Sequence, residues 1–298
     1  MSDRKWQRSS LRRVAEQLTE AGYRISQTTL RRLLEEMKYS LKANVKRLAG
    51  SSHPDRARQF EYIASQKRLF AARGMPIISV DTKKKELIGN FKNPGQTWRQ
   101  TAVAVNDHDF EQDALGKAAP YGIYDLKHNR GYVYVGQSAD TPQFAVDNIV
   151  RWWVDEGQFL YPGANKLLIL ADAGGSNGCR PRLWKLHIQE QLANRLDLEV
   201  TVCHYPTGAS KWNPIEHRLF SLISINWAGE PLRTFEFMLA CIRGTVTDTG
   251  LHVKANLVED VYCKGIQVAK SAMEALCIEM HPICPRWNYT IRPQSPGI

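Results

Sequence analysis

The chain has 298 residues and a formal net charge of +10, with 40 Lys and Arg against 30 Asp and Glu. At roughly 100 to 200 residues per domain, this length allows a large core and one appended domain. No apolar stretch approaches the roughly 20 residues that a membrane span needs, which argues against a membrane protein. The polar start MSDRKW lacks the apolar region of a secretory signal, so we expect a cytosolic protein with reduced thiols.

The positive charge is concentrated near the start of the chain. Residues 1 to 73 hold 17 basic and 7 acidic side chains, whereas the remainder holds 23 of each. Such asymmetry is typical of an arm or domain that neutralises phosphate, attached to a globule of balanced charge. The simpler alternative is a solvated basic face with no partner. We therefore expect nucleic acid to bind the N-terminal region.

Two amphipathic helices separated by a turn are predicted within residues 1–50. In the first helix, apolar residues recur at helical spacing: Leu11, Val14, Ala15 and Leu18. Gly22 then ends this helix, and Ser26 is placed to cap a second helix over residues 27–37. The second helix and its end carry polar and basic side chains: Thr28, Thr29, Arg31, Arg32 and Lys38. This pattern predicts a helix-turn-helix-like DNA-binding region, although a plain helical hairpin has the same periodicity.

A linker and one further helix are predicted over residues 51–74. The stretch from residue 40 to 55 is polar and contains GSSHP. Residues 57–73 follow, with Phe60, Ile63 and Leu69 on one side of a helix.

The globular core is predicted over residues 75–230. Short β-branched runs between turn residues predict five strands, at residues 77–80, 121–126, 132–135, 167–171 and 198–203. The segment KHNRG joins the second and third strands as a hairpin, and helices are expected at residues 141–156, 181–195 and 214–226. This order predicts an α/β fold with a mixed five-stranded sheet covered on both faces. Trp152 or Trp153 should lie in its core, and residues 231–298 should pack on it as a C-terminal extension.

Three acidic residues lie where apolar runs end. Asp81 closes PIISVD, Asp172 closes LLILAD, and Glu216 lies in the first turn of a helix that begins NPIEHRLF. Carboxylates at strand ends are rigidly held yet open to solvent, which suits hard divalent cations such as Mg²⁺. Each acid also has a structural explanation. The aspartates could form Asx-turns, and Glu216 could complete a capping box with Asn213 as N-cap and Pro214 as the first helical residue.

The six cysteines include no Cys-x-x-Cys pair. Cys277, His281 and Cys284 could belong to a zinc site, but they supply only three ligands, and a fourth would have to come from afar, such as from Cys263. We therefore expect no zinc and interpret the thiols as small buried hydrophobes.

The three segments that contain these acids are similar to the signature blocks of a known family. They read ISVDTKKKE at residues 78–86, ADAGGSNG at 171–178 and CHYPTGASKWNPIEHRLF at 203–220. In these blocks the chain resembles the Rhodopirellula-type DDE transposases of bacterial insertion sequences, and the resemblance runs from about Ser10 to WNYTIRP at residues 287–293. It implies an RNase H-like fold, as in mariner-like transposases and retroviral integrases, with Asp81, Asp172 and Glu216 in the positions of the catalytic triad. Family members carry more sequence before the segment matching Ser10, so we expect an N-terminally shortened chain, which would affect recognition of transposon ends.

The resemblance also implies a metal-dependent reaction on DNA. Two Mg²⁺ or Mn²⁺ ions would activate the attacking oxygen and stabilise the leaving oxygen at phosphorus. Asp81 would bridge both ions, while Asp172 and Glu216 would each complete one. Water would free a 3′-hydroxyl at the transposon end, and that hydroxyl would then attack target DNA. The implied partner is double-stranded DNA at the nucleoid of the bacterial cytosol, and the sequence leaves formation of a homodimer open.

Basic and polar residues near the three acids are candidates for DNA contacts. They are Lys83, Lys84, Lys85, Ser176, Asn177, Lys211, Trp212 and Arg218. The lysines could bind phosphate or form a solvated hairpin, and the glycines of residues 174–178 could admit phosphate or simply form a tight turn. Trp212 could stack on a splayed base or pack against the helix start. His204 and His217 are expected to be structural.

Two other functions are compatible with these residues. A metal-dependent nuclease of the same fold would cleave without strand transfer, and a transposase-derived DNA-binding protein would not cleave at all. The intact carboxylates in all three blocks argue against the second function. If Glu216 is not the third ligand, Glu190 on the preceding predicted helix is the replacement.

Overall fold

The computed structural model describes residues 10–39 and 54–294, and the chain divides into two compact units, residues 1–49 and 50–298. Within the described residues of the smaller unit are two helices, α1 (Leu11–Glu20) and α2 (Gln27–Glu36). No helix in the described part of the chain is both long enough and apolar enough to cross a membrane.

The caps of the two short helices follow the sequence prediction. Ser26 accepts a hydrogen bond from the backbone N–H of Thr29 at 3.1 Å, and Ser10 caps α1 in the same way. Gly22 has a φ of +93°, a conformation that glycine adopts without strain, and it lies just past the end of α1. The predicted pair of helices is confirmed, with Met37 as the C-cap of α2 rather than its last residue.

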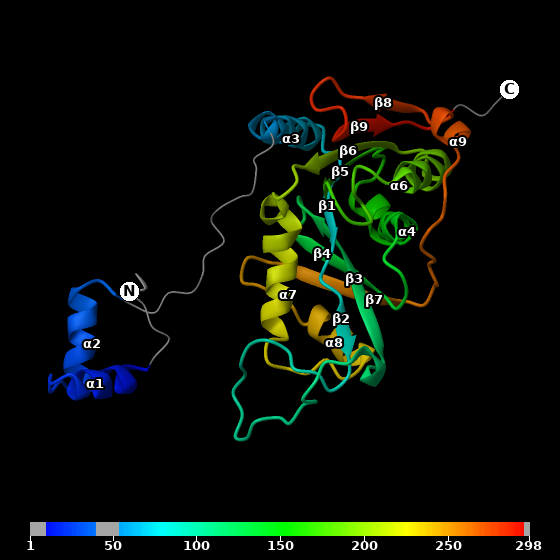
Figure 1. Cartoon of the computed structure of the whole chain (residues 1–298). Helices are drawn as coiled ribbons and strands as arrows, with labels where there is room; N and C mark the ends of the chain where they lie inside the picture. The colour runs from blue at the N-terminus through cyan, green and yellow to red at the C-terminus, as the bar shows by residue number, and fades with distance from the viewer. Residues whose placement is uncertain (1–9, 40–53, 295–298) are drawn as a thin grey trace. The chain divides into compact units, whose positions relative to one another are not determined.

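The larger unit is built on one mixed sheet (Figure 1). Its described strands are β1 (Ile77–Thr82), β2 (Glu86–Ile88), β3 (Gly116–Asp125), β4 (Arg130–Gly136), β5 (Lys166–Asp172), β6 (Glu199–Tyr205), β7 (His252–Val258), β8 (Ile278–Met280) and β9 (Asn288–Ile291). They are ordered β7-β4-β3-β1-β5-β6-β9-β8, with β2 beside β3. In the centre, β3 is antiparallel to both β4 and β1, whereas β1, β5 and β6 are parallel. This central arrangement is the RNase H-like core that the resemblance implies.

All five predicted strands form this centre, but the sheet is wider than predicted. Strand β7 adds parallel to β4, and β9 and β8 add antiparallel beyond β6. Both additions come from residues 231–298. The C-terminal segment therefore extends the sheet at both edges.

The helices of the larger unit come from both the predicted and the unpredicted segments. They are α3 (Arg56–Ala72), α4 (Pro142–Trp152), α5 (Gln158–Leu160), α6 (Arg182–His187), α7 (Ser221–Asn226), α8 (Phe235–Arg243) and α9 (Lys270–Glu274), with 3₁₀ turns at η1 (Glu111–Asp113) and η4 (Ser210–Trp212). Each of the three helices predicted within the core contains a π-helical turn: η2 (Trp153–Gly157), η3 (Ile188–Asn194) and η5 (Glu216–Phe220). Such turns occur frequently at functional sites, and η5 begins with Glu216.

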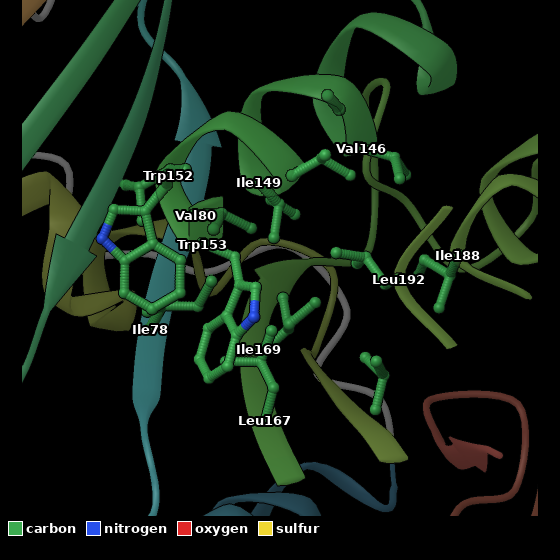
Figure 2. Close-up of a cluster of buried hydrophobic side chains, with 14 of the residues drawn as sticks. Ile78, Val80, Val146, Ile149, Trp152, Trp153, Leu167, Ile169, Ile188 and Leu192 are labelled. Carbon is green, nitrogen blue, oxygen red and sulfur yellow. The ribbon is translucent and has the colours of Figure 1, made fainter. Parts of the chain in front are cut away.

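One face of the sheet is covered by α4, α6 and η3. Figure 2 shows Trp152, Trp153 and Ile149 packed over Ile78 and the neighbouring strands. Both tryptophans are buried, which confirms the prediction that at least one lies in the core. This layer packs on the parts of β1 and β5 that precede Asp81 and Asp172.

The other face is covered by α3, η5–α7 and α8. Ile63 and Phe70 of α3 are buried against Ile77 and Leu168 of the sheet. Gln59 of α3 is fully buried and reaches the far strands, because its amide bonds to the carbonyl of His204 and to the side chain of Asn288. Helix α3 is therefore part of the larger unit.

Candidate active site

Asp81 and Asp172 lie at the carboxyl ends of two adjacent parallel strands. Val80 of β1 is in register with Ala171 of β5, so the aspartates that follow them are neighbours at the same edge of the sheet. Side chains alternate along a strand, and Val80 and Ala171 both point into the core beneath α4. The two aspartates consequently face the opposite side, where η5 lies.

Asn213 joins the start of η5 to these strand ends. Its amide oxygen accepts a hydrogen bond from the Ser79 hydroxyl, and its amide nitrogen donates to the Val80 carbonyl and to Asp172 Oδ1, each at 3.3 Å. The Ser79 hydroxyl also accepts from the backbone N–H of Ile215 at 3.1 Å. Glu216 follows Ile215 directly, so this hydrogen-bond network positions Glu216 near the two aspartates.

This network also bears on the alternative capping explanation. Asn213 directs its side chain to β1 and β5 and makes no side-chain cap of the helix. The contact from Glu216 back to Asn213 is a backbone one, from N–H to carbonyl at 3.1 Å. The capping box that was the alternative explanation of Glu216 is therefore not formed.

The three carboxylates act electrostatically on one another. Burial and the Asp172 carboxylate raise the pKa of Asp81 to about 8, against the backbone N–H of Thr82, which donates to Asp81 Oδ1 at 2.8 Å. Burial and Glu216 raise the pKa of Asp172 to about 6. Burial also raises the pKa of Glu216, while nearby Lys83 opposes this shift. The site is thus a half-buried concentration of negative charge.

The three carboxylates do not by themselves form a closed metal site among the described residues. Within residues 10–39 and 54–294, no three His, Cys, Asp or Glu side chains form a group that could hold a metal ion by themselves. The carboxylates are close enough to shift each other's pKa, but they do not form a complete cage.

Polar residues that the sequence analysis did not single out surround Asp81 on its other side. Asp140 accepts a hydrogen bond from the Thr82 hydroxyl at 3.2 Å and helps to raise the pKa of Asp81. The Tyr121 hydroxyl is buried without a hydrogen-bond partner among the described residues, and burial, Asp81 and Asp140 all raise its pKa. Tyr121 pairs with Thr82 across β3 and β1, a relationship that is visible only once the strand register is known.

The loop after Asp172 folds back on itself. Ser176 and Asn177 are buried, with the Ser176 hydroxyl 3.4 Å from that of Thr82. The Asn177 amide nitrogen has no hydrogen-bond partner in the described part of the chain. Gly178 is required by packing, because a Cβ there would lie 2.9 Å from the carbonyl of Ala173. The tight turn is therefore real, and its two predicted donors point inward.

The three predicted lysines lie in different surroundings. Lys83 is largely buried, pairs with Glu86 at 3.2 Å and lies over the Trp227 ring at 4.8 Å. Lys84 is exposed, and Lys85 is partly buried. Lys83 is therefore a fixed cation near Glu216, and Lys84 is the one of the three that is most open to solvent.

The segment before η5 presents Lys211 and Trp212 to solvent. Trp212 is 53% exposed, with the Lys211 ammonium 5.2 Å from its ring centroid. The Trp212 and Phe60 rings pack edge to face, with their centroids 5.9 Å apart. Arg218 is also exposed. A half-exposed indole of this kind can pack against the protein with one part of its ring and leave another part open for stacking on a base.

The two histidines near the site differ. His204 is fully buried, with Nδ1 2.9 Å from the backbone carbonyl of Asp172 and Nε2 3.2 Å from the Tyr289 hydroxyl. Its two ring nitrogens are therefore occupied in fixing β5 and β9. His217 is exposed on η5.

Cys277, His281 and Cys284 do not gather into a group that could hold a metal ion in the described part of the chain. Both ring nitrogens of His281 are within hydrogen-bond distance of other groups, Tyr62 at 2.7 Å and Thr290 at 2.8 Å. All six cysteines are free. Cys203 is buried, and Cys179, Cys241 and Cys284 are partly buried, whereas the interpretation of the thiols as buried hydrophobes was wrong for the exposed Cys263 and Cys277.

The N-terminal candidates lie on the smaller unit. Arg31 and Arg32 are exposed on α2 and pair with Glu35 and Glu36 one turn later, at 3.5 and 3.6 Å. Lys38 follows the helix with a φ of +61°. The acidic partners offset the positive charge of this helix, which the sequence analysis did not consider.

Comparisons with known proteins identify the family. A model of the family described as the Rhodopirellula transposase DDE domain matches residues 1–293. Among solved structures, the chain is similar to the Mos1 transposase paired-end complex with left transposon end, at 14% identity over 79% of this chain and 70% of that chain, with a TM-score of 0.45. A pre-cleavage Mos1 transpososome matches at 14% identity over 78% and 70% of the two chains, with a TM-score of 0.47. A comparison with curated proteins gives no match. Because the family model spans nearly the whole chain, the protein belongs to the Rhodopirellula-type DDE transposases.

Proposed function

We propose that Asp81, Asp172 and Glu216 are the catalytic residues of this transposase and that they act on the ends of an insertion sequence. The observation that carries the proposal is the Asn213 network, which brings Glu216 to the paired ends of β1 and β5. The effects of Asp172 and Glu216 on the pKa of Asp81, and of Glu216 on the pKa of Asp172, support a shared site. The nearest enzymatic alternative remains a nuclease that cleaves without joining.

The donor set fits Mg²⁺ or Mn²⁺. The proposed ligands are carboxylate oxygens, and the pKa values of Asp81 and Asp172 are raised by burial first and by the neighbouring carboxylates second, both of which a bound cation would offset. When bound, two such ions would stabilise the attacking and leaving oxygens at phosphorus. Since the described acids form no complete cage, we propose that phosphate oxygens of the DNA complete the ligand sets.

The chain's own residues would hold this site in place. Asp81 would contact both ions, with its carboxylate oriented by the Thr82 N–H, and Asn213 would orient Asp172. Lys83 would favour the charged form of Glu216, since it lowers the pKa that burial raises. In the first step a water oxygen bonds to phosphorus and the bond to the 3′-oxygen breaks, which leaves a 3′-hydroxyl and a 5′-phosphate. In the second step that 3′-oxygen bonds to a target phosphorus and displaces the target's 3′-oxygen.

DNA would be held by exposed or partly exposed basic and aromatic residues near the site and on the smaller unit. We propose Lys84, Lys85, Lys211, Trp212, Arg218, Arg31, Arg32 and Lys38 as contacts. Ser176 and Asn177 face inward, so we assign them to the scissile phosphate or its water, for which the unpartnered Asn177 amide is a suitable donor. Lys83 would act through Glu216.

A cleavage assay tests this proposal. The substrate is DNA that flanks the gene, incubated with and without Mg²⁺, and a second substrate carries a pre-cleaved end with a free 3′-hydroxyl. Cleavage of the first and joining of the second support a transposase. Cleavage without joined product would favour the nuclease, and binding without cleavage would favour a non-catalytic DNA-binding protein.

A further inference from the structure

A groove with a volume of about 580 Å³ lies beside the loop that follows Asp172. It is lined by residues of the 173–181 loop, by Thr207 after β6, by the 284–287 turn before β9, and by Asp55 at the start of α3. None of the three proposed catalytic acids lines it, so it is a separate feature next to the site.

Two arginines at the groove have no acidic partner among the residues that the structure describes. Arg180 and Arg286 line it, both are exposed, and neither has a hydrogen bond or ion pair within the described residues. Two guanidinium groups, those of Arg180 and Arg286, therefore line the groove beside one acid, Asp55. Such an excess attracts phosphate.

Much of the remaining lining is apolar or bare backbone. Pro181, Pro285 and Trp287 contribute apolar surface, and Gly174 and Gly175 contribute main chain. A Cβ built on Gly174 would meet no atom within 4 Å, so the space above it is open. The apolar face of an unstacked base could pack on such a lining. A duplex could not do so, because it presents mainly phosphate and keeps its bases stacked.

The walls of the groove are fixed relative to the catalytic strands. Gln59 and Asn288 exchange reciprocal amide hydrogen bonds in the interior, at 2.8 and 2.6 Å, and join α3 to β9. Gln59 also donates to the backbone carbonyl of His204, whose ring contacts the Asp172 carbonyl. A strand that passes Asp172 would thus meet the groove at a constant position.

We propose that this groove binds one unstacked nucleotide of single-stranded DNA next to the cleavage point, with its base on the apolar lining and its phosphates on Arg180 and Arg286. The inference rests on the proposed function only for the position of this nucleotide next to the cleavage point, since binding itself requires no catalysis.

The test measures binding of the full chain to a fluorescein-labelled single-stranded oligothymidine about ten nucleotides long, a length within the usual site sizes of single-strand binders. Gly174→Val fills the open space, and the double variant Arg180→Ala/Arg286→Ala removes the charge. Arg68→Ala on α3 is the matched control, because Arg68 is exposed, lacks a partner among the described residues and lies outside the groove lining. Thermal unfolding checks that each variant folds.

We expect Gly174→Val and the double variant each to bind roughly tenfold more weakly, as loss of one stacked base or of two phosphate contacts predicts, and Arg68→Ala to bind normally. An oligonucleotide with 5-iodouracil should crosslink to residues 173–181 or 284–287. Folded variants that bind within twofold of the original protein, or crosslinks confined to other segments, would overturn the inference. An equal loss for a blunt duplex would also overturn it, because the contact would then be with phosphate alone.

The result is separable from that of the cleavage assay. If cleavage is absent but the groove variants still lose affinity, the groove inference stands and the catalytic proposal fails. If cleavage occurs and the groove variants bind normally, only the groove inference is wrong.

Discussion

The Ser79 hydroxyl donates a hydrogen bond to the amide oxygen of Asn213, 134 residues further along the chain, and both side chains are fully buried. The contact joins β1 to the turn that precedes Glu216. Through its amide nitrogen, Asn213 also reaches Asp172 on β5. One amide thus fixes the relative positions of all three segments that carry the proposed catalytic acids.

Removing either partner should destabilise the protein. Ser79→Ala removes the partner of the Asn213 amide oxygen and of the Ile215 N–H, and Asn213→Ala removes the acceptor of the buried Ser79 hydroxyl and one donor to the Val80 carbonyl. We expect each variant to lose about 2 kcal/mol in urea unfolding. The double variant should lose clearly less than the sum, since the two residues share one network.

A control separates stability from positioning in this experiment. Thr201→Val removes a buried hydroxyl pair with Thr290 in the β6–β9 part of the sheet. It should cost stability but leave DNA cleavage unchanged, whereas Asn213→Ala should lower both. Strictly additive losses for Ser79 and Asn213 would show that the two side chains are not coupled.

The ion-free protein should lose stability as pH rises from about 6.5 to about 8. The pKa of Asp81 is raised to about 8, above its ordinary value of 3.8, so the folded state keeps a proton that the unfolded state has lost. That contribution is complete below the ordinary pKa and disappears as pH rises through the raised one. The expected loss in this window is about 1–2 kcal/mol in urea unfolding with EDTA. Asp81→Asn should flatten the slope, and the exposed Asp248→Asn should keep it. An unchanged slope for Asp81→Asn would contradict the assignment.

His204 should give the opposite dependence at lower pH. Burial lowers the pKa of His204 from 6.5 to about 4, although a hydrogen bond with the Asp172 carbonyl opposes the shift. The neutral ring favours folding above the ordinary pKa, and this contribution is lost as pH falls toward about 4, by about 3 kcal/mol. His204→Gln should lose less stability than the original protein over this range, and the exposed His217→Gln should behave like the original. Parallel curves for all three proteins would exclude this role.

Deletion of residues 1–49 should weaken DNA binding without unfolding the rest. This segment carries 12 basic and 5 acidic side chains, so its loss should lower the affinity for duplex DNA and flatten the dependence of affinity on salt. The deletion must end before α3, because Ile63 and Phe70 are buried against the sheet. A deletion through residue 73 should therefore also lower the unfolding temperature. Filter binding across a salt series and thermal unfolding measure both effects, and an unchanged salt slope would refute the role of this segment.

The sequence predicts the central strands and the paired aspartates well. Asp81 and Asp172 each follow a short apolar run, and parallel strands that are neighbours bring their carboxyl ends together. The wider sheet was not predicted, although β7 alternates exposed and buried residues along most of its length. Its partner β4 is more than 100 residues away, and the edge it completes is visible only in the fold.

Asn213 shows why the rest of the site needed the structure. Before Pro214, an asparagine is a good N-cap by local rules. In the folded protein its partners are Ser79, Val80 and Asp172, all distant in sequence, and these contacts outweigh the local cap. The groove beside Asp172 could not be predicted for the same reason, because its walls come from four segments that are far apart in the sequence.

The most direct test of the account is the Mg²⁺-dependent cleavage rate of Glu216→Gln beside Asp81→Asn and Asp172→Asn. Glutamine keeps the size and most of the packing of Glu216 but loses the charge that a metal ligand supplies. We predict an unfolding free energy within about 1 kcal/mol of the original protein for Glu216→Gln and a cleavage rate lower by about three orders of magnitude for each variant. The double and triple substitutions should cost scarcely more, because the three acids act as one unit. Near-normal cleavage by Glu216→Gln would contradict the account and remove this residue from the site.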